Sequence, residues 1–293
     1  MNKKLMQLGK PIFGIFLIAV ILYSLNVSDL LSLGSSVSFS CLFLSFSALI
    51  ISNLLSALRW RRIASLMGVE ITRGFAIQTY AQGIATNTVI PGGILGGDAW
   101  RVMSLKLQGI ESKIALTTVV VDRLSGVWAL ALGSMLAMLF ALTLNLVPEN
   151  IEFYWLSAYG IFVLSISLVP LFVHVLAKHS VSAIWKTGFF SIVIQLFNQL
   201  AFGLCVYAVT PNFSWILLIG FGAGIFIAAI IPLSIGGFGP RELGAVFFLS
   251  VIGIGAEAGF LASILYGLLC TGQGLLSIYY WMNRPRESDF LFK

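Results

Sequence analysis

Two glycine-rich breaks, each followed by an arginine, interrupt a chain that is otherwise strongly apolar. The stretch 90–101 reads IPGGILGGDAWR, and the stretch 231–241 reads IPLSIGGFGPR. Both begin with Ile-Pro and end in the spacing Gly-Gly-x-x-x-Arg, formed by Gly96, Gly97 and Arg101 in the first break and by Gly236, Gly237 and Arg241 in the second. Proline ends a helix and glycine permits a tight turn with positive φ, so each break predicts a turn between two short helices.

The helix that leaves each break is expected to begin with unpaired backbone N–H groups and the positive end of its dipole. Such an end attracts phosphate, and an arginine on the first turn adds a fork of further donors. Arg101 and Arg241 are therefore candidate anion-binding residues, together with the glycines of their turns. The alternative is that the glycines only allow close helix packing, while the arginines extend to the nearest membrane surface.

A third charged element, Asp122–Arg123, lies inside the apolar segment 112–145. If a helix begins near Ser112, Arg123 lies about 16 Å along it, close to the middle of a bilayer. A charge there costs at least ~2.5 kcal/mol, so it needs a partner or a water-filled cavity. Because adjacent helix positions point in different directions, we expect Asp122 to pair with Arg101 or Arg241 and to leave Arg123 for a ligand. The alternative is an ion pair that only joins two helices.

Several polar residues are secondary candidates for the same site. Asp98 is expected near the N-cap of the helix after the first break, and Glu242 either caps the second helix or acts as a proton-carrying carboxylate. Gln195 and Gln199 share a helix face at spacing i, i+4, where they either line a cavity or only hydrogen-bond between helices. Asn87 precedes the first break.

Neither a metal site nor a cofactor is expected. The three cysteines stand singly in apolar segments, and the two histidines form no cluster with metal-ligand spacing. The chain also contains no Gly-x-x-x-x-Gly-Lys-[Ser/Thr] phosphate loop, so any drive from ATP would have to come from another protein.

The composition is that of an integral membrane protein. Of 293 residues, 59% are hydrophobic and 10% are charged, and the mean hydropathy is +1.00. A soluble protein carries about 25% charged residues, so this class is excluded. The net charge of +6 favours contact with a membrane surface over nucleic acid, because no basic face with interleaved aromatic residues occurs.

Basic residues predict the topology, because lysine and arginine mark the cytoplasmic flanks of membrane spans. Of the 17 lysines and arginines, all except Arg123 and Arg241 fall on flanks that this rule assigns to the cytoplasm. The rule is satisfied when both breaks are re-entrant hairpins, at about 72–110 and 213–256, that enter from opposite faces. We therefore predict an all-α polytopic integral membrane protein with about seven full spans, two re-entrant helical hairpins and both termini in the cytoplasm. Residues 1–293 are expected to form a single transmembrane domain with no soluble domain.

The two breaks also share a pattern that is typical of inverted repeats. Corresponding broken segments of opposite orientation occur in inverted-repeat transporters, whose binding sites lie near the membrane midplane between the repeats. A binding site between the two breaks is therefore expected.

Three sequence blocks resemble the signature motifs of one membrane-protein family: NTVIPGGILGGDAWRV at 87–102, VDRLSG at 121–126 and IPLSIGGFGPRE at 231–242. They are similar, in this order, to the lysylphosphatidylglycerol synthase transmembrane-region family, also called the flippase domain of the multiple peptide resistance factors. The resemblance implies a multi-pass protein of the bacterial cytoplasmic (inner) membrane that moves or handles lipids. It also implies a lipid-headgroup cavity lined by Arg101, Asp122, Arg123, Arg241 and Glu242.

Bifunctional members of that family carry a soluble aminoacyl-transferase domain after the membrane region, whereas this chain ends at Lys293. We therefore expect no enzyme activity, and lysylphosphatidylglycerol is not implied as the substrate.

The leading expectation is a flippase or transporter for an anionic phospholipid or polyprenyl-phosphate headgroup, held by the arginines and the two helix ends. Its partners would be membrane lipids and not nucleic acid. One alternative is an intramembrane transferase on a lipid-linked substrate, with Asp122 and Glu242 as the acid–base groups. The other is a non-transporting partner of a lipid-modifying enzyme complex.

Overall fold

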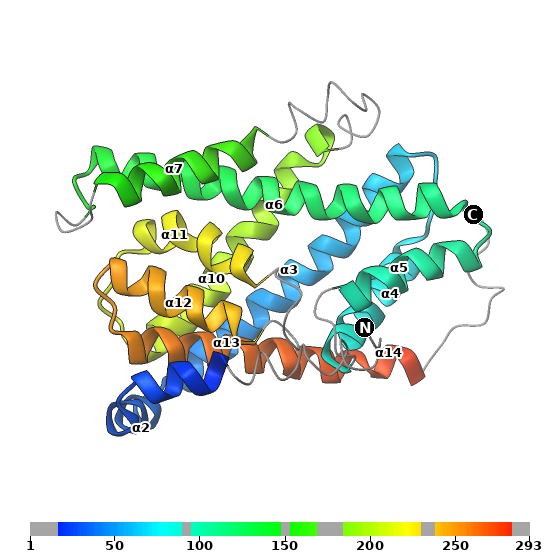
Figure 1. The fold of residues 1–293 in the computed structure, drawn as a ribbon. Coiled ribbons are helices and arrows are strands. Elements are labelled where there is room, and N and C mark those ends of the chain that lie inside the picture. Colours follow the sequence, from blue (N-terminus) through cyan, green and yellow to red (C-terminus); the bar gives the residue numbers. More distant parts are fainter. Residues whose placement is uncertain (1–16, 90–94, 148–152, 169–183, 230–237, 283–293) are drawn as a thin grey trace, which may run out of the picture.

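The computed structural model describes residues 17–89, 95–147, 153–168, 184–229 and 238–282. Within these ranges every regular element is a helix, which confirms the all-α prediction. Figure 1 shows the arrangement of the helices. After a short helix at Leu17–Ser24 they are α2 (Val27–Ser35), α3 (Phe39–Leu66), α4 (Arg73–Val89), α5 (Leu95–Leu107), α6 (Ser112–Thr143), α7 (Phe153–Ser167), α10 (Gly188–Val209), α11 (Trp215–Ala228), α12 (Pro240–Val251), α13 (Ala256–Ser277) and α14 (Tyr279–Met282).

Four helical segments are long and apolar enough to cross a bilayer: α3, α6, α10 and Ala256–Trp281, which contains α13. The count rises to five if Leu17–Ser24 and α2, which meet at 94°, form one bent span. The expected count of about seven full spans is therefore not confirmed in the described residues. α7 has 15 residues, fewer than the ~20 that a helix needs to span the hydrocarbon core. Residues 169–183, which follow α7 in the sequence, lie outside the described residues.

Two pairs of short helices occupy the places where the sequence predicts hairpins. α4 packs against α5, and α11 packs against α12. The turns within the two pairs, at 90–94 and 230–237, lie outside the described residues, and so do Gly236 and Gly237. None of the four helices exceeds 17 residues, so none is long enough to span a membrane alone.

The helices α3–α6 and α10–α13 make corresponding contacts. α3 and α10 pack against each other at the centre, and the long helices α6 and α13 run along opposite sides of the molecule (Figure 1). α4 contacts α13 while α5 contacts α6; in the same way, α11 contacts α6 while α12 contacts α13. Each pair of short helices is thus held between both long helices.

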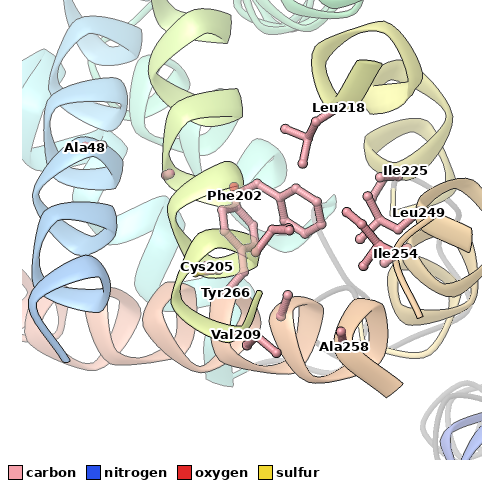
Figure 2. Close-up of a cluster of buried hydrophobic side chains, with 14 of the residues drawn as sticks. Ala48, Phe202, Cys205, Val209, Leu218, Ile225, Leu249, Ile254, Ala258 and Tyr266 are labelled. Atoms are coloured by element: carbon pink, nitrogen blue, oxygen red, sulfur yellow. The ribbon is translucent and has the colours of Figure 1, made fainter. Parts of the chain in front are cut away.

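A buried hydrophobic cluster joins the second set of helices to α3. It contains Phe202 and Cys205 from α10, Leu218 and Ile225 from α11, Leu249 from α12 and Tyr266 from α13, as Figure 2 shows. The Phe202 and Tyr266 rings meet edge to face, with their centroids 5.5 Å apart. This geometry suits the aromatic quadrupoles and fixes α13 against α10.

The first helix pair is held by a close approach between glycines. A Cβ atom on Gly83 of α4 would lie 3.2 Å from the carbonyl oxygen of Gly97 on α5, and a Cβ atom on Gly97 would lie 2.8 Å from the side-chain nitrogen Nδ2 of Asn87. Small residues allow helices in membranes to approach this closely. Close packing of α4 and α5 therefore requires glycine at position 97, independently of the turn between these helices.

Candidate functional site

A pocket of about 620 Å³ lies at the centre of the molecule, with walls from both sets of helices. It receives side chains from α3, α4, α5, α6, α10, α11, α12 and α13. Its charged lining residues, in the part of the chain that the structure describes, are Arg59, Arg101, Arg123, Arg241, Asp98 and Asp122. The sequence singles out all of these except Arg59.

Asp122 lies at the centre of the largest ion-pair cluster. Its carboxylate accepts hydrogen bonds from Arg101 Nη1 at 2.8 Å and from Arg59 Nε at 2.9 Å. Arg59 also donates from Nη2 to the main-chain oxygen of Asp122 and from Nη1 to Ser191. The expected pairing of Asp122 with Arg101 is therefore present, and Arg59 is a second partner that the sequence analysis missed.

Arg59 carries a signal in the sequence that identifies its environment. Ser45, Ser52, Ser56 and Arg59 recur at helical spacing on the buried face of α3. A stripe of small polar residues is typical of a helix face that packs in a polar interior. The position of Arg59 within the basic sequence RWRR hides this pattern, because such a cluster also marks a cytoplasmic flank.

Two sequence expectations about Asp98 and Arg123 are wrong. Arg123 is paired: its Nε and Nη2 donate to the two oxygens of Asp98 at 2.8 and 2.9 Å. Asp98 does not cap α5, because its carboxylate faces Arg123 and the Gly97 amide donates to Asn87 Oδ1 instead, at 2.6 Å. α5 begins at Leu95, earlier than the cap role of Asp98 requires. This start also places Arg101 in the second turn of α5 and not in the first.

Arg101 makes the fewest side-chain hydrogen bonds of the four arginines described at the pocket. The residue is 2% exposed, yet its Nε and Nη2 have no hydrogen-bond partner among the described residues. The nearest carboxylate oxygen to Nη2, on Asp98, is 3.7 Å away. The guanidinium carbon lies 4.9 Å from the ring centre of Trp60 and 5.1 Å from that of Tyr80, so α3 and α4 hold the group in place through cation–π contacts.

Nε and Nη2 form one edge of a guanidinium, with their N–H bonds parallel. That edge is used by the other three arginines of the pocket: by Arg59 for Asp122, by Arg123 for Asp98 and by Arg241 for Glu242. Among the arginines described at the pocket, Arg101 alone has no hydrogen-bond partner on this edge. The edge matches two oxygens of a phosphate or carboxylate.

At the second helix pair, Arg241 and Glu242 bond to each other. Arg241 Nη2 donates to Glu242 Oε1 at 2.7 Å, and Ser263 on α13 donates to the same oxygen at 3.0 Å. The other Glu242 oxygen accepts the amide of Gly239, whose φ of +102° favours glycine. Glu242 therefore does cap α12. The Arg241 guanidinium lies between two rings, 5.1 Å from Phe238 and 5.5 Å from Tyr266.

The remaining sequence candidates divide between the pocket and other surroundings. Asn87 and Gln195 line the pocket, and Gln195 donates to the Gly126 carbonyl at 2.9 Å. Gln199 does not line it, because its amide points to α11 and donates to the Ile219 carbonyl. Gly96 lies beside Thr86 on α4.

A wall of uncharged polar side chains also borders the pocket and is mostly absent from the sequence expectations. Asn53 donates to Gln273 at 2.8 Å, and Ser52 donates to Asn198 at 2.8 Å. The described residues contain no group of three or more histidine, cysteine or acidic side chains that could hold a metal ion. The arrangement suits the binding of an anion that also has hydrogen-bonding groups.

A model of the lysylphosphatidylglycerol synthase transmembrane region matches residues 7–185 and 175–271. The chain belongs to the lysylphosphatidylglycerol synthase transmembrane-region family. The match to this family includes both pairs of short helices and every charged residue described at the pocket. It confirms the resemblance seen in the three sequence blocks, and it supports a lipid-related membrane protein.

A similar curated protein is the UPF0104 membrane protein PH1989 of Pyrococcus horikoshii. It is 28% identical over 137 residues, which are 46% of this chain and 41% of that protein. The chain thus covers less than half of the relative's length. That relative is named as a membrane protein, in agreement with the apolar helices of this chain.

Proposed function

We propose that this protein moves a membrane lipid between leaflets by holding the anionic headgroup in the central pocket. The observation that carries the proposal is the Nε/Nη2 edge of Arg101, which is buried in the pocket wall and has no hydrogen-bond partner among the described residues. A buried donor without a partner costs about 1–3 kcal/mol, and a bidentate phosphate would recover this free energy. Membership of a family named for a lipid enzyme's membrane region supports a lipid as the source of the phosphate.

The arrangement of helices supports transport in particular. In this proposal α4–α5 and α11–α12 are re-entrant hairpins that enter from opposite faces of the bacterial inner membrane, with both termini in the cytoplasm. Their corresponding contacts with α6 and α13 then reflect an inverted repeat, and the pocket lies between the repeats. Motion of one repeat against the other would expose the pocket to each leaflet in turn.

The test is lipid movement in proteoliposomes that contain the full chain and a fluorescent anionic phospholipid. Arg101→Gln removes the unpaired edge but leaves Asp122 paired with Arg59, so the protein should fold and move lipid about tenfold more slowly. Arg101→Lys keeps the charge without the fork and should also be slow. The rate is measured as loss of fluorescence after a membrane-impermeant quencher is added.

Lys106→Gln is the matched control, because Lys106 lies on the same helix, is exposed and does not line the pocket. It should move lipid at the wild-type rate. A wild-type rate for Arg101→Gln would contradict the assigned site. No movement by the wild-type protein would contradict transport and would favour the role of a binding partner in a lipid-modifying complex.

A further inference from the structure

We infer that the pocket selects a phosphodiester lipid that carries one negative charge and an uncharged, hydroxyl-bearing headgroup. The inference rests on the proposed function and names the substrate class of the same site. Three features of the pocket carry it: its charge balance, the occupation of its carboxylates and the chemistry of its neutral wall.

The charge balance matches a single negative charge. Four arginines line the pocket, and three carboxylates, Asp98, Asp122 and Glu242, are bonded to them, which leaves an excess of one positive charge. The neighbouring segments 90–94 and 230–237 contain no charged residue in the sequence, so they do not alter this balance. A ligand with one negative charge leaves the buried site neutral, the state with the smallest desolvation cost.

Every carboxylate described at the pocket is already engaged by an arginine. Asp122 accepts from Arg59 and Arg101, Asp98 accepts two hydrogen bonds from Arg123, and Glu242 accepts from Arg241. An ammonium group in the pocket would therefore meet four arginines and no unengaged carboxylate among the described residues. Lipids with an amine in the headgroup are disfavoured by this repulsion.

The neutral wall provides hydrogen bonds suited to hydroxyl groups. Asn53 gives one amide hydrogen to Gln273, and both residues line the pocket with amide groups, which can donate and accept further hydrogen bonds. Thr271 is also part of the lining. A glycerol or sugar headgroup supplies both donors and acceptors to such a wall, whereas a bare phosphomonoester does not.

The inference is tested with the full chain in vesicles of phosphatidylcholine that contain one fluorescent test lipid at a time. We expect phosphatidylglycerol, a phosphodiester with a glycerol headgroup, to move about tenfold faster than phosphatidylethanolamine, its amine-bearing counterpart. It should also move faster than phosphatidic acid, a phosphomonoester that carries more than one negative charge at neutral pH. A rate for either of these lipids equal to or above that of phosphatidylglycerol would overturn the inference and leave the proposed function intact.

A single substitution should abolish the selectivity. Gln273→Glu places a carboxylate in the pocket with nearly the same shape and keeps the hydrogen bond that Asn53 donates. The variant should move phosphatidylethanolamine faster relative to phosphatidylglycerol, changing the ratio of their rates about tenfold. Gln108→Glu makes the same chemical change outside the pocket and should keep the wild-type ratio.

The outcomes separate the two proposals. If no test lipid moves with the wild-type protein, the proposed function fails and the inference fails with it. If lipids move but the ratio is unchanged in Gln273→Glu, only the selectivity inference is overturned.

Discussion

Asp122 and Asp98 have different environments although both bind arginine. The Asp122 side chain is 1% exposed and holds two buried guanidinium groups, whereas the Arg123 side chain that faces Asp98 is 42% exposed. A buried charge that loses its partner keeps its full desolvation cost, but an exposed one regains water. The two aspartates are therefore expected to contribute unequally to stability.

Asp122→Asn should lower the free energy of unfolding by about 3 kcal/mol, because it leaves Arg59 and Arg101 buried without a counter-charge. Asp98→Asn should lower it by about 1 kcal/mol or less. Thermal unfolding of the two purified variants in the same detergent measures the difference. Equal losses would show that the buried cluster is not what holds α3, α5 and α6 together.

At the scale of elements, each pair of short helices depends on small residues where its helices meet. Gly97 faces Gly83 so closely that a methyl group at Gly97 has no room. The same residue donates its amide to Asn87, which ties the start of α5 to the end of α4. This contact fixes the start of α5 and therefore helps to set the position of Arg101, which lies on the same helix.

Gly97→Ala should destabilise the protein by about 2 kcal/mol, because its Cβ would push α5 away from α4. It should also slow lipid movement, since Arg101 follows on the same helix. Gly133→Ala on α6 is the control, because a Cβ there meets nothing within 4 Å, and its effect on stability should be about 1 kcal/mol or less. Denaturant unfolding and the vesicle assay measure the two effects. A tolerated Gly97→Ala would mean that the turn, not this contact, sets the position of α5.

At the scale of the whole molecule, the pocket exists because two sets of four helices meet around it. The long helices α6 and α13 each contact one helix from both short pairs, so neither pair can move without a change at both long helices (Figure 1). This linkage is what a rocking mechanism between repeats requires. The membrane orientation of the two pairs can be tested directly.

Two single-cysteine variants, made in a chain whose Cys41, Cys205 and Cys270 are replaced by serine, test this orientation. Ser112→Cys, between α5 and α6, should react with a membrane-impermeant maleimide only from the cytoplasmic side. Asn212→Cys, before α11, should react only from the opposite side. Both positions are exposed in the structure. Labelling of intact cells and of inverted vesicles gives the comparison. The reverse pattern at both sites would show that α4–α5 is a full crossing and would contradict its re-entrant arrangement.

The sequence predicted the helical membrane class and most of the charged site, since both follow from residue types. Arg101, Asp122, Arg123 and Arg241 stand out because charges are costly inside an apolar chain. The expected number of spans depended on helix lengths that are not reached in the described residues, as for α7. The sequence analysis missed Arg59 for a different reason. A basic residue on a cytoplasmic flank and a buried arginine at the end of a span look alike in sequence.

By itself, the sequence determined that this chain lies in a membrane, where its helices break and which charges must find partners there. The cause is local, because hydropathy, proline and glycine act within a few residues of their own position. Only the tertiary structure decided which charges pair: Asp98 pairs with Arg123, and Asp122 pairs with Arg59. It also showed that the Nε/Nη2 edge of Arg101 has no hydrogen-bond partner among the described residues. Such pairing depends on the distance between side chains from different helices. Helical periodicity defines the face of each helix, but the packing of the helices sets that distance.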